Sequence, residues 1–378
     1  MLHHLEPETI LTLLASLAVI LASAELFTNG IEWLGHRLNL AEGAVGSVLA
    51  AVGTALPETL IPFVAILIAG GEAGSEIGLG AILGAPFMLS TLAMFVTGVA
   101  AVAYRRRRPT GSRVIVTRHV VTRDLGFFLI MYGAAVLVSF VSRAAHQALC
   151  FVLLVGYGIY LWQTFADPSV AESEIHALRL HSLLLRWRHR RGDGEDLGSY
   201  RERLNSLSDG APRIRVILGQ VLIALLGIIG GAYIFVGAAK QTAAALGVAP
   251  LLIALVIAPI ATELPEKFNS VVWMRQGKDT YALGNITGAM VFQSAFPVSL
   301  GMWFTAWRLL APAGRPQHAL YSAVIALFAG LYLLLAALLS PREQPNAGQP
   351  SRVRLHPAVL LVGGLLYGAF IVLLILRV

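Results

Sequence analysis

The chain has 378 residues, of which 57% are hydrophobic and 13% charged, and its formal net charge is +7. Soluble proteins carry about a quarter charged residues, so this composition excludes an ordinary soluble domain and indicates an integral membrane protein. The single cysteine, Cys150, excludes an intramolecular disulfide and a cysteine-rich metal site.

Apolar segments long enough to cross a bilayer as helices recur along the chain, since a crossing needs about 20 residues. The start, "MLHHLEPETI", lacks the basic region of a secretory signal, so we expect the first apolar segment to be retained as a helix. We predict an all-α integral membrane fold with ten transmembrane helices. The predicted spans are about 8–28, 41–68, 77–103, 124–141, 146–165, 216–236, 243–271, 280–306, 317–339 and 357–376.

Lysine and arginine are distributed unevenly between the two sides of the predicted membrane. Of the 28, the loops after the odd-numbered spans hold 22, the remaining loops and the termini hold 5, and Lys267 lies inside a span. Basic loops stay in the cytoplasm, so both termini are predicted outside, in a multi-pass protein of the cytoplasmic membrane. This asymmetry explains the positive charge without a nucleic-acid partner. The arginine run at 105–108 is then a topology anchor or a contact with anionic lipid.

The sequence contains the same pentapeptide pattern twice, "TALPE" at 54–58 and "TELPE" at 262–266. An offset of 208 aligns 25–60 with 233–268 without a gap, and nine of the 36 positions are identical. Five spans per half is an odd number, so the second copy must enter the membrane from the opposite side. This predicts an inverted repeat, as in many secondary transporters. The predicted division is 1–165 (first repeat, with its α-repeat about 41–103), 166–215 (basic cytoplasmic loop) and 216–378 (second repeat, with its α-repeat about 243–306).

Each copy places a proline well inside a span. Because proline has no N–H and clashes with the carbonyl four residues back, Pro57 frees the carbonyl of Gly53 and Pro265 frees that of Ala261. Lipid cannot satisfy a free carbonyl, so both helix breaks are expected to face protein or a water-filled cavity.

Oxygen atoms gather next to these breaks. Glu58 and Glu266 add carboxylates, and Thr54 and Thr262 add hydroxyl and carbonyl oxygens. Such a set of hard oxygens suits a cation, and two carboxylates suit a divalent ion such as Ca²⁺. One copy alone is equally well explained by a kink with a structurally paired glutamate, but two inverted copies favour the ion site.

The motifs resemble those of the Ca²⁺/cation antiporter superfamily, which includes the sodium/calcium exchangers. "VGTALPETLIPFVAIL" followed by "GLGAILGAPF" is similar to the first α-repeat of that family, and "APIATELPEKFNS" with "LGNITGAMVFQ" is similar to the second. The segment "SAELFTNGIEWLGHRLNLAEGAVGSVLAAVG" resembles the usual lead-in. The resemblance implies a sodium/calcium exchanger-like fold of ten helices with both termini outside.

The resemblance also implies roles for particular residues. Glu58 and Glu266 become the central cation-binding carboxylates, Thr54 and Thr262 contribute oxygens, and Asn285 matches the first Asn of a GNxxGSN segment. Several family polar positions are changed here, which puts three-sodium coupling in doubt; the replacing residues are Ala55, Glu263, Ala81, Ala85, Pro86, Ala289 and Met290.

Several residues of the second repeat are candidates to compensate. On a continuous helix Glu263 would share a face with Glu266, and a pair of close carboxylates would allow H⁺ rather than Na⁺ as counter-ion; Glu263 is equally a structural partner of another polar group. Lys267 is either a tethered cation near Glu266 or a side chain that extends toward the cytoplasmic end of its helix. Further oxygens are offered by Asn269, Ser270 and Gln293.

The resulting hypothesis is a secondary antiporter, not an enzyme. It would exchange Ca²⁺ or another cation for Na⁺ or H⁺ by alternating access at a midplane site, with no cofactor and no partner beyond inorganic cations and the lipid bilayer. The sequence has no GxxxxGK[ST] motif for ATP. A degenerate, non-transporting sensor or scaffold remains an alternative. An intramembrane metal-dependent enzyme is disfavoured because all ten histidines lie outside the central parts of the spans. The oligomeric state stays open.

Overall fold

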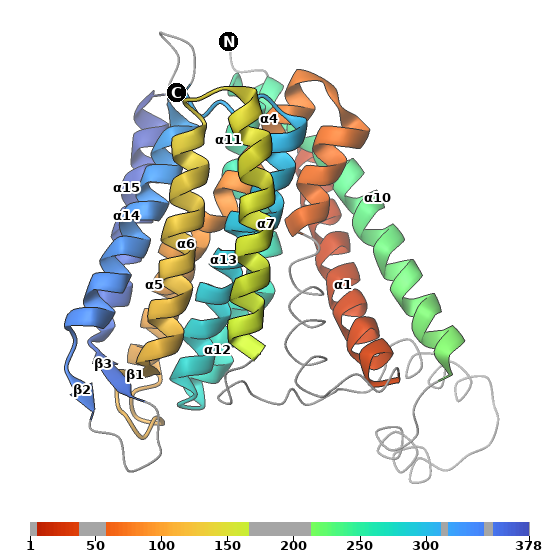
Figure 1. Cartoon of the computed structure of the whole chain (residues 1–378). Coiled ribbons are helices and arrows are strands. Elements are labelled where there is room, and N and C mark those ends of the chain that lie inside the picture. Colours follow the sequence, from red (N-terminus) through yellow and green to blue (C-terminus); the bar gives the residue numbers. More distant parts are fainter. Residues whose placement is uncertain (1–5, 38–57, 166–212, 311–316, 344–350, 378) are drawn as a thin grey trace, which may run out of the picture.

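A computed structural model describes residues 6–37, 58–165, 213–310, 317–343 and 351–377. Within these ranges eleven α-helices pack side by side into a bundle, and the first, α1 (Pro7–Arg37), starts on the face where the last, α15 (Pro357–Arg377), ends (Figure 1). Seven helical segments of these ranges are long and apolar enough to cross a membrane, one of them continuous over Gly71–Ala103, and two shorter apolar helices cover Glu58–Ala69 and Pro250–Ile260.

The first half of the chain contains α1, a short helix that starts at Glu58, and a hairpin back into the bundle. The short helix ends in a π-helical segment, η2 (Val64–Ala69), and the chain turns at Gly70 and Gly71, both of which have positive φ. The elements of this half are α1 (Pro7–Arg37), α4 (Gly71–Met88), η3 (Leu89–Ala93), α5 (Met94–Ala103), α6 (Arg118–Val138) and α7 (Arg143–Phe165).

The second half differs from the predicted spans 216–236 and 243–271 where they adjoin, since the first helix ends later and the next begins later, at Pro250. The helix predicted to end at 236 continues to Leu246, because alanine-rich residues carry it to a left-handed cap at Gly247, with φ 68°. The helices of this half are α10 (Ile214–Leu246), α11 (Pro250–Thr262), α12 (Leu264–Arg275), α13 (Asp279–Phe304), α14 (His318–Leu339) and α15 (Pro357–Arg377).

A three-stranded antiparallel sheet lies at the opposite end of the bundle from the C-terminus (Figure 1). Its order is β1 (Val114–Thr117), β3 (Arg352–Leu355) and β2 (Arg342–Glu343), with Val114 opposite Leu355. The sheet lies in segments that were predicted as loops. Short strands far apart in the chain leave little local signal, because their stability comes from pairing and from the buried faces of both strands.

The sheet is fastened to the start of α13 by a buried ion pair. Arg108 Nη2 lies 2.9 and 2.8 Å from the two carboxylate oxygens of Asp279, and the Ile115 backbone N–H donates to the same carboxylate at 2.8 Å. Both charged side chains are almost fully buried. The arginine run at 105–108 therefore contributes a structural contact, through Arg108, besides its positive charge.

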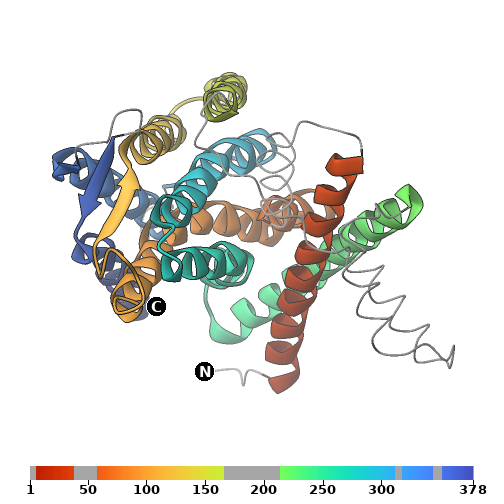
Figure 2. The same cartoon turned by 90° about the horizontal axis from the view of Figure 1, so that it is seen from below.

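Close helix packing brings the two halves together. A Cβ atom on Gly80 or Gly84 of α4 would lie 2.3 Å from the carbonyl of Leu251 or Leu255 on α11, so only glycine permits this approach. At one edge of the bundle α1 packs along α10 (Figure 2). The contact between α4 and α11 positions the wall of the candidate site.

Candidate functional site

The first carboxylate of the site belongs to Glu58, at the start of the short helix Glu58–Ala69. Its side chain is buried, and the Gln293 amide of α13 donates a hydrogen bond to Glu58 Oε2. Gln293 is itself fully buried. The predicted site residues Gly53, Thr54 and Pro57 lie outside the described residues.

The second half of the site lies where α11 and α12 meet. Glu263 is the single residue between them, with φ −85° and ψ 3°, and Pro265 follows in the first turn of α12. Since Pro265 has no N–H, it cannot donate to the carbonyl of Ala261. The two helices have 13 and 12 residues, so the interruption falls at the centre of the combined span.

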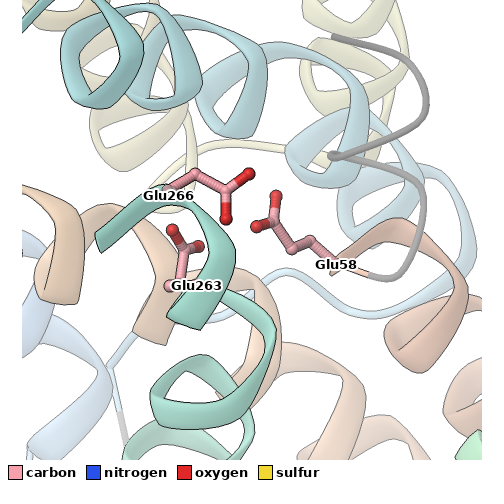
Figure 3. Close-up of side chains that lie close together, drawn as sticks. All are labelled: Glu58, Glu263 and Glu266. Atoms are coloured by element: carbon pink, nitrogen blue, oxygen red, sulfur yellow. The ribbon is translucent and has the colours of Figure 1, made fainter. Parts of the chain in front are cut away.

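Three buried carboxylates converge at this interruption. One oxygen from each of Glu58, Glu263 and Glu266 lies within 4.8 Å of the others (Figure 3). All three side chains are at most 5% exposed. Both oxygens of Glu263 and Oε1 of Glu58 have no hydrogen-bond partner among the described residues. Burying carboxylate oxygens without donors is costly, so this geometry suits a site that binds a cation or protons.

The wall beside the carboxylates is largely apolar. A small cavity is lined by Glu58, Ile61, Ala81, Ala85, Ala258, Pro259 and Thr262. The Thr262 hydroxyl donates to the carbonyl of Ala258 at 3.2 Å, which leaves its oxygen lone pairs available as acceptors. Ala81 and Ala85, two positions where the family resemblance would place polar side chains, therefore lie at the site itself.

The other predicted polar residues connect α12 to α13. Asn285 Nδ2 donates to the carbonyl of Glu266 at 3.1 Å and approaches the Ser270 hydroxyl at 3.4 Å. Ser270 in turn donates to the carbonyl of Ala282 at 2.9 Å. These bonds fix the backbone that carries Glu266. Asn269 is half-buried beside Ser270, and its role stays a prediction.

Of its two predicted directions, Lys267 adopts the one toward the site. Its side chain is only 7% exposed, and Nζ donates to the carbonyl of Pro259 at 3.3 Å, back toward the centre of the span. Helical side chains lean toward the N-terminus of their helix, which explains the direction. Sequence reasoning missed Pro259 as part of the site; the available signal was a second proline six residues before Pro265.

Comparison with known proteins identifies a matching family and a similar protein. The family model described as "Sodium/calcium exchanger protein" matches residues 8–166 and again 216–376. The "Putative antiporter CaxA" of Alkalimonas amylolytica is 25% identical over 322 residues, which cover 83% of this chain and 86% of that protein.

Two solved structures share the fold. The H⁺/Ca²⁺ exchanger CAX superposes with a TM-score of 0.67 at 16% identity, covering 97% of this chain and 82% of that one. The sodium-calcium exchanger NCX_Mj, soaked with 2.5 mM Na⁺ and 1 mM Sr²⁺, superposes with a TM-score of 0.53 at 20% identity, covering 97% and 99%. The described helices thus form an all-helical membrane fold like that of both exchangers.

Proposed function

Because the chain belongs to the sodium/calcium exchanger family, whose members are secondary transporters and not enzymes, we propose that it is a divalent-cation antiporter. It exchanges Ca²⁺ or a similar cation for a counter-ion by alternating access. The observation that carries this proposal is the buried cluster of Glu58, Glu263 and Glu266, whose oxygens lie within 4.8 Å of one another. Hard carboxylate oxygens at this spacing suit Ca²⁺ better than a soft metal.

In this proposal the chain has ten spans, arranged as two inverted repeats of five. The two separate matches to the family model and the start of α1 on the same face as the end of α15 both support it (Figure 1). The repeats would be 1–165 and 216–378, joined by the basic loop 166–215. The distribution of lysine and arginine favours a cytoplasmic membrane with both termini outside.

Within the site, Glu58, Glu263 and Glu266 act as the cation ligands. Thr262 adds an oxygen from the cavity wall, and Asn285 positions Glu266 through its backbone carbonyl. Thr54, which aligns in sequence with Thr262, is the matching candidate of the first repeat.

The counter-ion in this proposal is H⁺. Ala81 and Ala85 offer no side-chain oxygens for Na⁺ on the cavity wall, whereas a cluster of three carboxylates can carry protons when the cation leaves. A protein of the same fold is an H⁺/Ca²⁺ exchanger, which is consistent with this choice.

Transport by purified protein in liposomes tests the proposal. Vesicles that are acidic inside should accumulate radioactive Ca²⁺, and dissipating the pH gradient with a K⁺/H⁺ ionophore should stop accumulation. Na⁺-loaded vesicles without a pH gradient should show little uptake. Glu58→Gln should abolish uptake, and Glu72→Gln, a change on an exposed side chain, should not.

The results also separate the alternatives. Uptake that is driven by Na⁺ and insensitive to pH would show that the counter-ion is Na⁺ and not H⁺. No uptake under any gradient would contradict the transporter and favour the sensor or scaffold. Equal uptake by Glu58→Gln and the unmodified protein would remove Glu58 from the ion site.

A further inference from the structure

Lys267 spans the interruption between two helices. Its backbone N–H donates to the carbonyl of Glu263 at 3.1 Å, and its ammonium reaches back to the carbonyl of Pro259 on α11. Pro259 lines the cavity that Glu58 also lines. The ammonium is therefore held at the edge of the carboxylate cluster and away from the end of the helix.

Nearby negative charges compensate the positive charge of the buried Lys267 ammonium. Glu58, Glu263 and Glu266 all act on it through charge, and a buried ammonium is expensive without such compensation. The C-terminal end of α11 adds partial negative charge beside Pro259, and the N-terminal end of α12 adds partial positive charge beside Glu263 and Glu266. The Lys267 ammonium thus lies next to the negative end of α11, and Glu263 and Glu266 lie next to the positive end of α12.

We propose that Lys267 is a tethered counter-charge that sets the valence of the transported ion. With all four groups ionised, three carboxylates and one ammonium leave a net charge of −2, which one divalent cation neutralises. Without the ammonium the same carboxylates carry −3, which matches a trivalent cation. Lys267 is therefore a specificity-determining residue, and the inference rests on the proposed function of the cluster as a divalent-cation site.

Direct binding to purified protein in detergent, at one fixed pH, tests this role. Isothermal titration with Ca²⁺ and with La³⁺ gives the ratio of the two affinities for each variant. Lys267→Met should shift that ratio toward La³⁺ by about tenfold or more, because one unit of positive charge leaves a poorly screened site. Lys267→Arg keeps the charge and should keep the ratio. Lys278→Met, on an exposed lysine outside the cluster, is the matched control.

A second pair of variants avoids the risk that Lys267→Met fails to fold. Glu263→Gln alone leaves a net charge of −1 and should bind Ca²⁺ weakly. Adding Lys267→Met restores −2, so the double variant should bind Ca²⁺ about tenfold or more tightly than Glu263→Gln. Removing a purely structural lysine would give no such gain.

The outcomes distinguish the two proposals. An unchanged La³⁺/Ca²⁺ ratio in Lys267→Met, or no gain in the double variant, overturns the role of Lys267 while Ca²⁺ transport by the unmodified protein stands. Absence of divalent-cation binding by the unmodified protein overturns the proposed function and the valence inference with it.

Discussion

Replacing Glu263 by glutamine should stabilise the cation-free protein. Two unit charges at 4.8 Å repel by about 3 kcal/mol at an effective dielectric constant of about 20. The substitution removes two such repulsions, with Glu58 and Glu266, and one attraction, to Lys267. If the attraction to Lys267 is as large as one repulsion, the net gain is about one pair, about 3 kcal/mol, and it is less where protons already reduce the charge. The new amide can also donate to a neighbouring carboxylate.

The same change should weaken stabilisation by cations. Ca²⁺ that binds only the folded protein raises its stability according to its affinity, and Glu263→Gln removes one ligand. We therefore expect a higher apparent melting temperature in chelator and a smaller rise on adding Ca²⁺. General damage to the fold would lower the melting temperature in chelator, so a higher value there together with a smaller rise on adding Ca²⁺ separates the predicted effects from such damage.

Thermal unfolding in detergent, followed by tryptophan fluorescence at a fixed scan rate, measures both effects. Trp307 is fully buried and should report loss of the core. Unfolding of a membrane protein is commonly irreversible, so variants are compared at one scan rate. Glu72→Gln, on an exposed side chain, is the control. A lower melting temperature for Glu263→Gln in chelator, or a full Ca²⁺ response, would refute the reasoning.

Three further changes test the packing and the site. Gly84→Ala places a Cβ 2.3 Å from a backbone carbonyl of α11, so it should lower the yield of monodisperse protein in size-exclusion chromatography. Arg108→Met leaves the buried carboxylate of Asp279 uncompensated and should destabilise the protein by about 3–5 kcal/mol, seen as a lower melting temperature. Gln293→Leu removes the donor to Glu58 and should weaken Ca²⁺ binding measured by titration.

Each of these changes has a control or a contradicting result. Gly126→Ala introduces a Cβ with no atom within 4 Å and should be tolerated, and Arg107→Met removes an exposed arginine from the same run. If Gly84→Ala behaves like Gly126→Ala, or Arg108→Met like Arg107→Met, the close helix contact or the ion pair is not important for stability. Unchanged Ca²⁺ affinity in Gln293→Leu would remove Gln293 from the site.

The sequence alone indicated the class of the protein and the residues at the centre of its candidate site. Apolar length is a local property, so hydropathy indicated a membrane protein, and the family match and the long apolar helices confirm that prediction. The matched "TALPE" and "TELPE" segments indicated Glu58 and Glu266 as candidate site residues, because a proline beside a glutamate in an apolar span is unfavourable without a function. The structure brings Glu58, Glu263 and Glu266 within one small region.

Contacts between distant segments could be decided only by the tertiary structure. Val114 pairs with Leu355, Gln293 meets Glu58, and Ala81 lines the cavity through the close approach of α4 to α11. No local pattern encodes these pairings, since each depends on how separate helices pack. The direction of the Lys267 side chain was likewise decided by the tertiary structure. Sequence limited it to two directions, and the carbonyl of Pro259 together with three buried carboxylates made the inward one favourable.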